Sequence, residues 1–223
     1  MTQPVLAFVH TIPANIETFD ALVGELAPDI PVRHALHGEL LKEALDAGEL
    51  TADIRRRTAE AVVKEAEKGA AVVLCTCSTV GPGADDAAGQ TATKVMRIDR
   101  PMAEAAVRTG ARIGVAATVS TTLGPTLDLL SDAAAQADKD IDLRPVVFEE
   151  ARAKLMEGDT ESYLRIIAEG LHLVAKDSDV IVLAQASMAP ALAQCQNIEV
   201  PILTSPRSGL EAAIQAYKSI CVS

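Results

Sequence analysis

Aromatic side chains are nearly absent from this sequence of 223 residues, in which two Tyr, three Phe and no Trp make up 2% of the chain. Proteins that bind nucleic-acid bases stack them on such rings, so the composition argues against a base-binding protein. No apolar run approaches the roughly 18 residues that span a bilayer. The first residues, Met1-Thr2-Gln3-Pro4, lead into an expected strand without the basic and apolar regions of a signal peptide. We therefore expect neither nucleic acid nor a membrane as a partner.

Basic residues and cysteines are also few. The chain has 20 Lys and Arg against 31 Asp and Glu, which gives a formal net charge of −11. Its one basic cluster, Arg55-Arg56-Arg57, falls in an expected helix and is expected to be a solvated face. Four cysteines are too few for a disulfide framework, and they favour a reducing, cytoplasmic location.

Short apolar runs rich in β-branched residues alternate with longer helical patterns along the whole chain. Strands are expected at 5–9, 31–35, 71–75, 95–98, 113–117, 141–147, 180–183 and 201–203, with helices such as 51–68, 123–130 and 161–176 between them. Strands that are apolar on both faces and separated by helices indicate parallel sheets covered on both sides. We expect an α/β fold with two pseudo-symmetric halves, each a four-stranded, mostly parallel sheet flanked by helices, and an active-site cleft between the halves.

The two halves are expected because segments of the chain repeat. The run 71–78 resembles 179–187, each is followed by an apolar strand that breaks at a proline, and each strand leads into a helix with Glu-Ala-Ala, at 104–106 and 211–213. We place the join near Gly110-Ala111-Arg112. The expected domains are an N-terminal half, 1–110, to which the C-terminal helix 206–217 could add, and a C-terminal half, 111–223.

Cys77 is the first candidate for chemistry. It follows a buried strand and precedes an expected helix start, where backbone N–H groups would stabilise a thiolate. Ser78 and Thr79 beside it can donate hydrogen bonds to a carboxylate. Cys75, still inside the strand, is expected to be a core residue. No His or Cys pair elsewhere completes a metal site with the two thiols, so no metal is expected.

Hydroxyl residues mark a second candidate site. The strand 113–117 ends in Thr118, Ser120, Thr121 and Thr122, after which a helix begins. Hydroxyls beside the free N–H groups of a helix start form a cup for an anion such as a carboxylate. One of Ser120 and Thr121 is expected to cap the helix, and the remaining hydroxyls exceed what a cap requires.

Histidine supplies a third candidate. The first strand ends in His10-Thr11, the counterpart of Thr118 in the other half. An imidazole titrates near neutral pH, so His10 is a candidate acid or base. His34, His37 and His172 lie on helical or edge segments and are expected to be exposed.

Three segments carry a family resemblance: 74–79, with Leu-Cys-Thr-Cys-Ser-Thr; 97–106, with Arg-Ile-Asp-Arg-Pro-Met-Ala-Glu-Ala-Ala; and 113–118, with Ile-Gly-Val-Ala-Ala-Thr. In order and spacing they resemble the aspartate/glutamate/hydantoin racemase superfamily, over almost the whole chain. The resemblance implies a cofactor-independent enzyme that binds a small carboxylate or hydantoin between its halves. One cysteine would lie on each side of the substrate carbon, and one thiolate would remove the α-proton while the other thiol protonates the opposite face. A homo-oligomer, a dimer or larger, is the expected assembly.

The resemblance matches Cys77 to the first-half cysteine of the family, Ser78 and Thr79 to its polar followers, and Thr118 and Thr121 to carboxylate-binding hydroxyls. At the second-half position this chain has Gln185, which can hydrogen-bond a substrate oxygen but is no useful proton donor at neutral pH. Cys195, ten residues further on and expected to be helical, is not expected to replace the missing thiol. The family often has Asp or Asn where this chain has His10.

Three interpretations of function remain open. The first is a racemase-like enzyme that moves a proton at the carbon next to a carboxylate, with Cys77 on one face and Ser187, His10 or water on the other. The second is a single-cysteine decarboxylase or isomerase of a small dicarboxylate, and the third is a catalytically silent carboxylate-binding protein. We expect the first, with two sets of site residues. The catalytic residues would be Cys77, Gln185, Ser187 and His10, and the substrate-binding residues Thr11, Ser78, Thr79, Thr118, Ser120 and Thr121.

Overall fold

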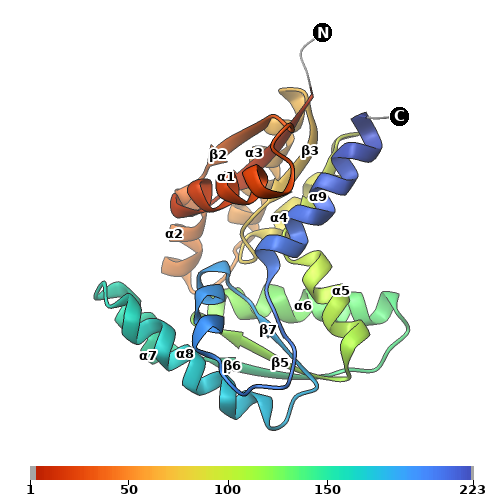
Figure 1. Cartoon of the computed structure of the whole chain (residues 1–223). Helices are drawn as coiled ribbons and strands as arrows, with labels where there is room; N and C mark the ends of the chain where they lie inside the picture. Colours follow the sequence, from red (N-terminus) through yellow and green to blue (C-terminus); the bar gives the residue numbers. More distant parts are fainter. Residues whose placement is uncertain (1–3, 222–223) are drawn as a thin grey trace. The chain divides into compact units, whose positions relative to one another are not determined.

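Two parallel sheets of four strands form the framework of the computed structural model, which describes residues 4–221 (Figure 1). The first sheet has the order β2-β1-β3-β4 and the second the order β6-β5-β7-β8. The strands are β1 (Val5–His10), β2 (Val32–Leu36), β3 (Ala70–Cys75), β4 (Lys94–Arg97), β5 (Arg112–Ala117), β6 (Asp142–Val147), β7 (Val180–Leu183) and β8 (Ile202–Leu203). The expected α/β class with two four-stranded sheets is confirmed, and each described strand pair is parallel.

Helices connect and cover the strands. They are α1 (Ala14–Leu26), α2 (Gly38–Ala47), α3 (Ala52–Glu67), α4 (Gly81–Ala88), α5 (Arg100–Thr109), α6 (Ser120–Gln136), α7 (Glu149–Met156), α8 (Thr160–Ala175), the 3₁₀ helix η1 (Ala186–Gln194) and α9 (Ser205–Cys221). None of the helices within residues 4–221 combines the length and the apolar character needed to cross a bilayer.

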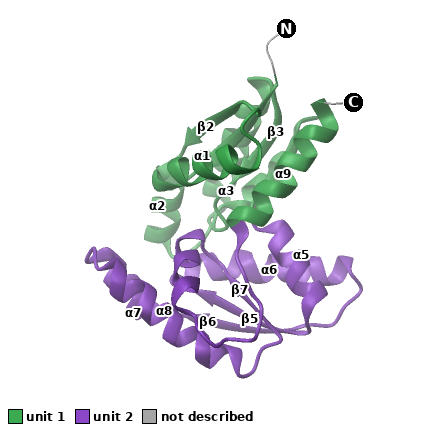
Figure 2. Ribbon diagram, in the orientation of Figure 1, with its two compact units in different colours: residues 1–98, 206–223 green, residues 99–205 purple. Residues whose placement is uncertain are grey.

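The packing divides the chain into two units at positions other than the expected join. Unit 2 holds residues 99–205, and unit 1 holds the described residues before and after this segment (Figure 2). The expected boundary at 110/111 follows the sequence repeat, but α5 packs its Met102, Ala103, Ala106 and Val107 into the core of the second sheet. Helix α9 packs Leu210, Ala213, Ile214 and Tyr217 into the core of the first. Helix α5 ends the first sequence repeat but packs in unit 2 with the second sheet. Helix α9 ends the second repeat but packs in unit 1 with the first sheet.

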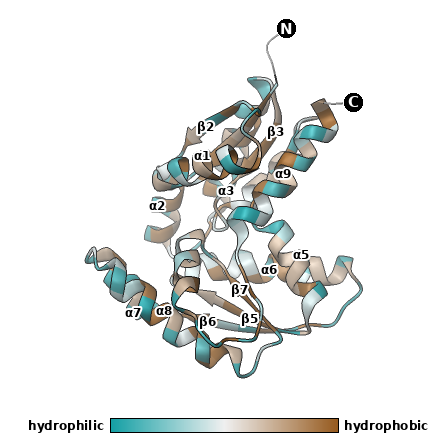
Figure 3. Ribbon diagram, viewed as in Figure 1, coloured by the Kyte–Doolittle hydropathy of each residue, from teal (hydrophilic) through white to brown (hydrophobic). Residues whose placement is uncertain are grey.

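The inner strands of the sheets, β1, β3, β5 and β7, are almost wholly buried, whereas the edge strands β2 and β6 are partly exposed. Figure 3 colours the ribbon by the hydropathy of each residue. In β3, Val73 and Cys75 belong to one core cluster, whereas Val72 and Leu74 belong to another. Successive residues of a strand point to opposite faces, so the two clusters lie on the two sides of the sheet. This double burial explains why the strands could be predicted as continuous apolar runs.

The register of the two sheets makes their strand ends equivalent. Val9 of β1 pairs with Cys75 of β3, and Ala116 of β5 pairs with Leu183 of β7. The next residue along each third strand donates its N–H back to the first strand, from Thr76 to the Val9 carbonyl at 3.0 Å and from Ala184 to the Ala116 carbonyl at 2.9 Å. Counting on from these pairs, Cys77 and Gln185 occupy equivalent positions, as the sequence repeat predicts.

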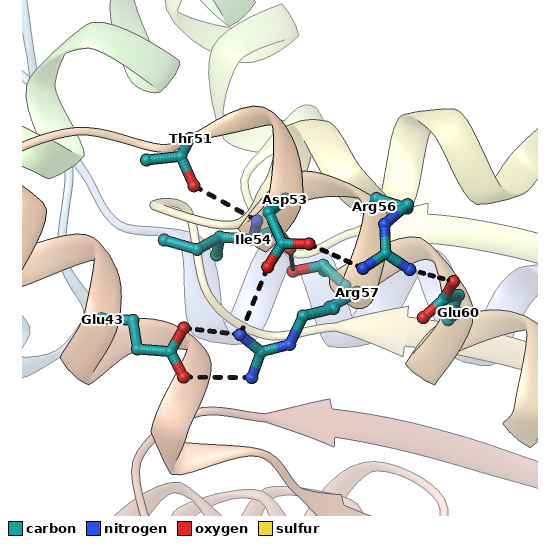
Figure 4. A network of polar contacts seen from close by, with 8 residues as sticks. Glu43, Thr51, Asp53, Ile54, Arg56, Arg57 and Glu60 are labelled. Carbon is teal, nitrogen blue, oxygen red and sulfur yellow. Dashed lines mark hydrogen bonds and ion pairs between the residues drawn. The ribbon is translucent and has the colours of Figure 1, made fainter.

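The basic cluster Arg55-Arg56-Arg57 lies on α3, where each guanidinium is paired with carboxylates. Figure 4 shows Arg56 between Asp53 and Glu60 and Arg57 against Glu43, at 2.5–2.6 Å between the closest atoms. Arg55 binds Asp86 of α4 through two hydrogen bonds. The cluster is therefore a solvated, internally neutralised face of the helix.

The start of α3 provides a test of the local structure. The Thr51 side chain accepts a hydrogen bond from the Ile54 N–H at 3.3 Å and so caps the helix (Figure 4). We expect Thr51→Ala to lower the free energy of unfolding by about 1 kcal/mol, because a capping Ser or Thr contributes about 0.5–2 kcal/mol. Urea denaturation measures the change. Thr160→Ala, at an exposed first-turn position of α8, should leave stability within about 0.5 kcal/mol, and equal losses in both variants would refute the capping role.

Candidate active site

Cys77 lies two residues beyond the end of β3, at the carboxyl edge of the first sheet. Its side chain is half-buried and packs against a core cluster, whereas Cys75 is fully inside that core. The Ser78 carbonyl accepts the Gly81 N–H at 3.2 Å, so a turn leads from Cys77 into α4. The expected helix start is therefore four residues further along than Cys77 itself. Cys77 is the thiol of this edge that solvent can reach, while Ser78 and Thr79 are buried beside it.

A chain of hydrogen bonds leads from this edge to the surface of unit 1. The buried His10 ring has Nδ1 at 2.7 Å from the Thr76 hydroxyl and Nε2 at 2.8 Å from Nδ1 of His34. Nε2 of His34 lies 3.0 Å from a carboxylate oxygen of Asp20 on α1, which is exposed. The two imidazoles stack on each other, with ring centroids 5.1 Å apart, and on Phe8.

The surroundings of His10 set the charge of its ring. Burial and, to a smaller extent, the neighbouring His34 lower the pKa of His10 to about 4, so His10 is neutral at pH 7. The Asp20 carboxylate can only accept, so the His34 nitrogen beside it carries hydrogen. The Thr76 hydroxyl also lies 3.3 Å from the Val9 carbonyl, to which it can donate. Both nitrogens of His10 are used, and the ring holds the Thr76 hydroxyl in place.

The other three histidines differ in how far they are exposed to solvent. His172 is exposed, as expected, and His37 is half-buried beside Glu39. The expectation that His34 is exposed is wrong, because β2 places its ring against His10 and Phe8 and leaves its side chain only 15% exposed. Edge strands usually show one face to water, and here α1 covers that face through Asp20 and Phe19.

Thr11, the residue after His10, has a hydroxyl that makes no hydrogen bond. The residue is buried, and no partner for its Oγ1 exists among residues 4–221. A buried polar group without a partner is disfavoured by about 1–3 kcal/mol. Such a group at a strand end is suited to bind a ligand oxygen.

At the equivalent edge of the second sheet, Thr118 holds Gln185. The Thr118 N–H and its hydroxyl both lie within hydrogen-bond distance of the Gln185 side-chain oxygen, at 2.6 and 3.0 Å. Because a backbone N–H can only donate, the amide oxygen must face Thr118. The Gln185 NH₂ group, which makes no hydrogen bond within the described part of the chain, is left as a donor.

Tyr163 of α8 reaches the same edge, and no sequence pattern singled it out. Its ring is buried in the core of unit 2, and its hydroxyl lies 3.0 Å from that of Ser187. Burial raises the pKa of the Tyr163 phenol, against the effect of hydrogen bonds with Ser187 and Thr118. Ser187 itself is exposed. A tyrosine inside a helical pattern ordinarily indicates a core position, so only the contact with Ser187 identifies it.

The start of α6 differs from the expectation in one respect. Its cap position is Val119, which offers no side-chain hydrogen bond, so neither Ser120 nor Thr121 caps the helix. The reason is that the helix begins at Ser120 itself, which places both hydroxyls inside the first turn. Ser120 is exposed, while Thr121 is buried and its hydroxyl has no partner among residues 4–221. Free N–H groups and an unpaired hydroxyl at one helix start are suited to an anion.

Cys195 lies at the opposite end of η1 from Ser187. It follows the last residue of η1, packs against a core cluster, and its thiol lies 3.3 Å from the Ala191 carbonyl. Burial raises its pKa, which disfavours the thiolate. Its place in the fold supports the expectation that it does not replace the missing thiol. Within residues 4–221, no three His, Cys, Asp or Glu side chains gather closely enough to hold a metal ion.

Comparison with known proteins identifies the fold. A glutamate racemase isoform of Bacillus anthracis superposes with a TM-score of 0.76 at 14% identity, over 100% of this chain and 85% of that chain. The aspartate racemase of Picrophilus torridus gives 0.71 at 14%, over 96% and 94%. An arylmalonate decarboxylase gives 0.57 at 16%, over 96% and 92%. Identities this low show a shared fold alone.

The sequence itself decides the family. No curated protein sequence matches the chain. The model of the family described as Asp/Glu/Hydantoin racemase matches residues 13–213, which is most of the chain. This match confirms the resemblance carried by the segments around Cys77, Arg97 and Thr118, and the chain therefore belongs to the Asp/Glu/hydantoin racemase family.

Proposed function

We propose that the protein catalyses cofactor-independent proton transfer at the carbon next to a carboxylate of a small acid, with Cys77 as the acid/base group. One observation carries the proposal above the others: two buried hydroxyls, of Thr11 and Thr121, have no hydrogen-bond partner among residues 4–221. Buried hydroxyls in folded proteins are nearly always hydrogen-bonded, so a water or a ligand oxygen is the expected partner of each. Both lie at carboxyl edges of the sheets, where parallel α/β folds bind ligands.

The substrate carboxylate is assigned to hydroxyls and helix N–H groups. Thr121 and the first-turn N–H groups of α6 bind one carboxylate oxygen, and exposed Ser120 adds a donor. Thr11, Ser78 and Thr79 are the other substrate-binding residues of the proposal. Loss of the α-proton turns the carboxylate into an enediolate with more negative charge, and fixed donors stabilise that state more than the ground state.

The proton transfer is assigned to Cys77. As a thiolate it takes the α-proton, and as a thiol it returns one. His10 does not exchange protons with the substrate in this scheme, because both of its nitrogens are occupied and it is neutral at pH 7. It holds Thr76, the residue before Cys77, in position. Gln185 donates a hydrogen bond from its NH₂ group to a substrate oxygen while Thr118 fixes its orientation.

A second candidate is loss of carbon dioxide from a small dicarboxylate, followed by protonation of the resulting enediolate by Cys77. Gln185 favours this candidate, because its amide is no useful proton donor. The decarboxylation needs a single proton donor, whereas inversion of a stereocentre needs both an acid and a base. The chain shares its fold with an arylmalonate decarboxylase. Thiol-dependent proton delivery to an enediolate is common to both candidates.

Incubation in D₂O separates the candidates. The protein is mixed with L- and D-aspartate, L- and D-glutamate, and an arylmalonate, and the products are analysed by NMR and chiral chromatography. We expect α-deuterium in an amino acid recovered as both enantiomers. Deuterium only in a decarboxylated product would favour the second candidate. The third outcome is that an acid binds and protects Cys77 from a thiol reagent, but no hydrogen is exchanged. The protein would then be a catalytically silent binding protein, and the proposal would be wrong.

The assembly and location follow the same proposal. We propose a homo-oligomer, a dimer or larger, that works in the cytoplasm on a small carboxylate, with neither nucleic acid nor membrane as a partner. The neutralised arginine cluster on α3 and the net charge of −11 support the absence of nucleic-acid binding. Light scattering of the purified protein measures the oligomeric state directly.

A further inference from the structure

The edge of the second sheet carries no acidic hydrogen at the position where the first sheet has Cys77. Gln185 stands there, and a carboxamide does not give up a proton at neutral pH. Ser187, two residues further along, is exposed and so reaches solvent or a ligand. A serine hydroxyl alone is a weak acid. Proton delivery from this edge therefore requires a second group behind Ser187.

Tyr163 is such a group. Its hydroxyl lies 3.0 Å from the Ser187 hydroxyl, and a hydrogen bond with Thr118 also contributes to its titration. Thr118 donates in turn to Gln185. These four side chains belong to one unit, and Ser187 is their exposed end. A phenylalanine would fill the core equally well, so the buried hydroxyl is not explained by packing.

We propose that Ser187 delivers the proton to the substrate from this edge and that Tyr163 is its proton source and positioning residue. The inference rests on the proposed function and names the donor that stands in for the second thiol. It assigns a role to Tyr163, which no sequence pattern indicated.

The protons and charges of the step balance. The step begins from the enediolate that loss of the α-hydrogen leaves. Its α-carbon forms a new C–H bond with the Ser187 hydrogen, while the Ser187 oxygen takes the hydrogen of the Tyr163 hydroxyl. The phenol becomes a phenolate, which takes over the negative charge that the enediolate loses. Water then returns a proton to the phenolate through exposed Ser187.

The resting protonation state of Tyr163 suits its role. Because burial raises the pKa of Tyr163, its phenol keeps its proton at neutral pH and acts first as a donor. A hydrogen bond from Ser187 stabilises the phenolate while it lasts.

The stereochemistry of exchange in D₂O tests the inference. In Tyr163→Phe, Cys77 still removes the α-hydrogen and returns deuterium to the same face. We expect inversion to slow by about 10²-fold or more, since a positioned acid contributes about 10²–10⁴-fold. Exchange with retained configuration should stay within about threefold of the wild-type rate for the enantiomer that Cys77 deprotonates. A purely structural defect would slow both processes together, and that result would overturn the inference.

Further variants complete the experiment. Ser187→Ala should show the same split between inversion and retention. Tyr217→Phe, which removes a hydroxyl bonded to the Pro4 carbonyl at 2.7 Å in unit 1, should match the wild type, as should Ser131→Ala on α6. Unchanged inversion in Tyr163→Phe or in Ser187→Ala refutes the inference and leaves the proposed function standing. Absence of exchange in the wild type with every acid tested would instead refute the proposed function itself.

Discussion

Cys77→Ser should lower kcat/KM for the α-proton reaction by about 10²–10⁴-fold, the range that a positioned acid/base group contributes. Serine is nearly the same size as cysteine, but its hydroxyl does not ionise near neutral pH. The variant should keep its fold, because Cys77 is only half-buried and lies beyond the end of β3. Steady-state assays of racemisation and of deuterium exchange measure the loss, and both should fall together.

The other cysteines supply the controls. Cys221→Ser and Cys195→Ser should retain activity within about twofold, because each thiol lies at the C-terminal end of a helix, Cys195 after η1 and Cys221 in α9, and neither directly follows a strand. A thiol reagent should modify Cys77 faster than Cys221, and a bound substrate should slow that modification. A Cys77→Ser enzyme that keeps more than about a tenth of its activity would show that another group moves the proton.

The buried His10 should make the protein less stable in mild acid. Its pKa is about 4 in the folded chain, because burial and His34 disfavour the charged ring, against about 6.5 in the unfolded chain. The unfolded chain therefore binds the proton first, so the stabilisation is complete above pH 6.5 and is lost as the pH falls towards 4. Between pH 7 and pH 5 the loss from this one group is about 2 kcal/mol.

Urea denaturation at the two pH values checks this number. In His10→Asn the difference in unfolding free energy between pH 7 and pH 5 should be smaller by about 2 kcal/mol than in the wild type. His172→Asn, which replaces an exposed histidine, should keep the wild-type difference. An NMR titration of the His10 ring in the wild type measures the same quantity without a variant. A His10 pKa near 6.5 in the folded protein would contradict the prediction.

Much of the fold could be predicted because the strands are buried on both faces. The run at 71–75 corresponds to β3 and that at 180–183 to β7, since a continuous apolar segment between helical patterns has few other interpretations. The repeat places the join at 110/111, whereas α5 packs with the second sheet; the packing of α9 agrees with the option that the C-terminal helix adds to the N-terminal half. The apolar faces of α5 and α9 fit either sheet by pattern, and only tertiary packing decides which core each helix joins.

The places of the candidate site residues in the fold could be predicted where they depend on the order of strands and helices, and could not where they depend on side-chain direction. Cys77, Thr118 and Gln185 follow buried strands, so their edge was evident from sequence. Tyr163 and His34 act through contacts with residues 24 positions away in each case, and their local patterns are those of ordinary core and edge residues. No spacing rule connects a tyrosine of one helix to a serine of a later 3₁₀ helix, so these contacts required the structure.

Because α5 and α9 each pack with the sheet of the other repeat, the cores of the two units are completed in a definite order as the chain is made. Unit 2 is one continuous segment, 99–205, and its core is complete once that segment has left the ribosome. Unit 1 begins earlier but needs Leu210, Ala213 and Ile214 of α9 to cover Leu6 and Phe8. Part of this apolar face, against which α1 also packs, stays uncovered until α9 has been made. The half that is made first is thus the last to close, and during that interval chaperones have an apolar strand surface to protect.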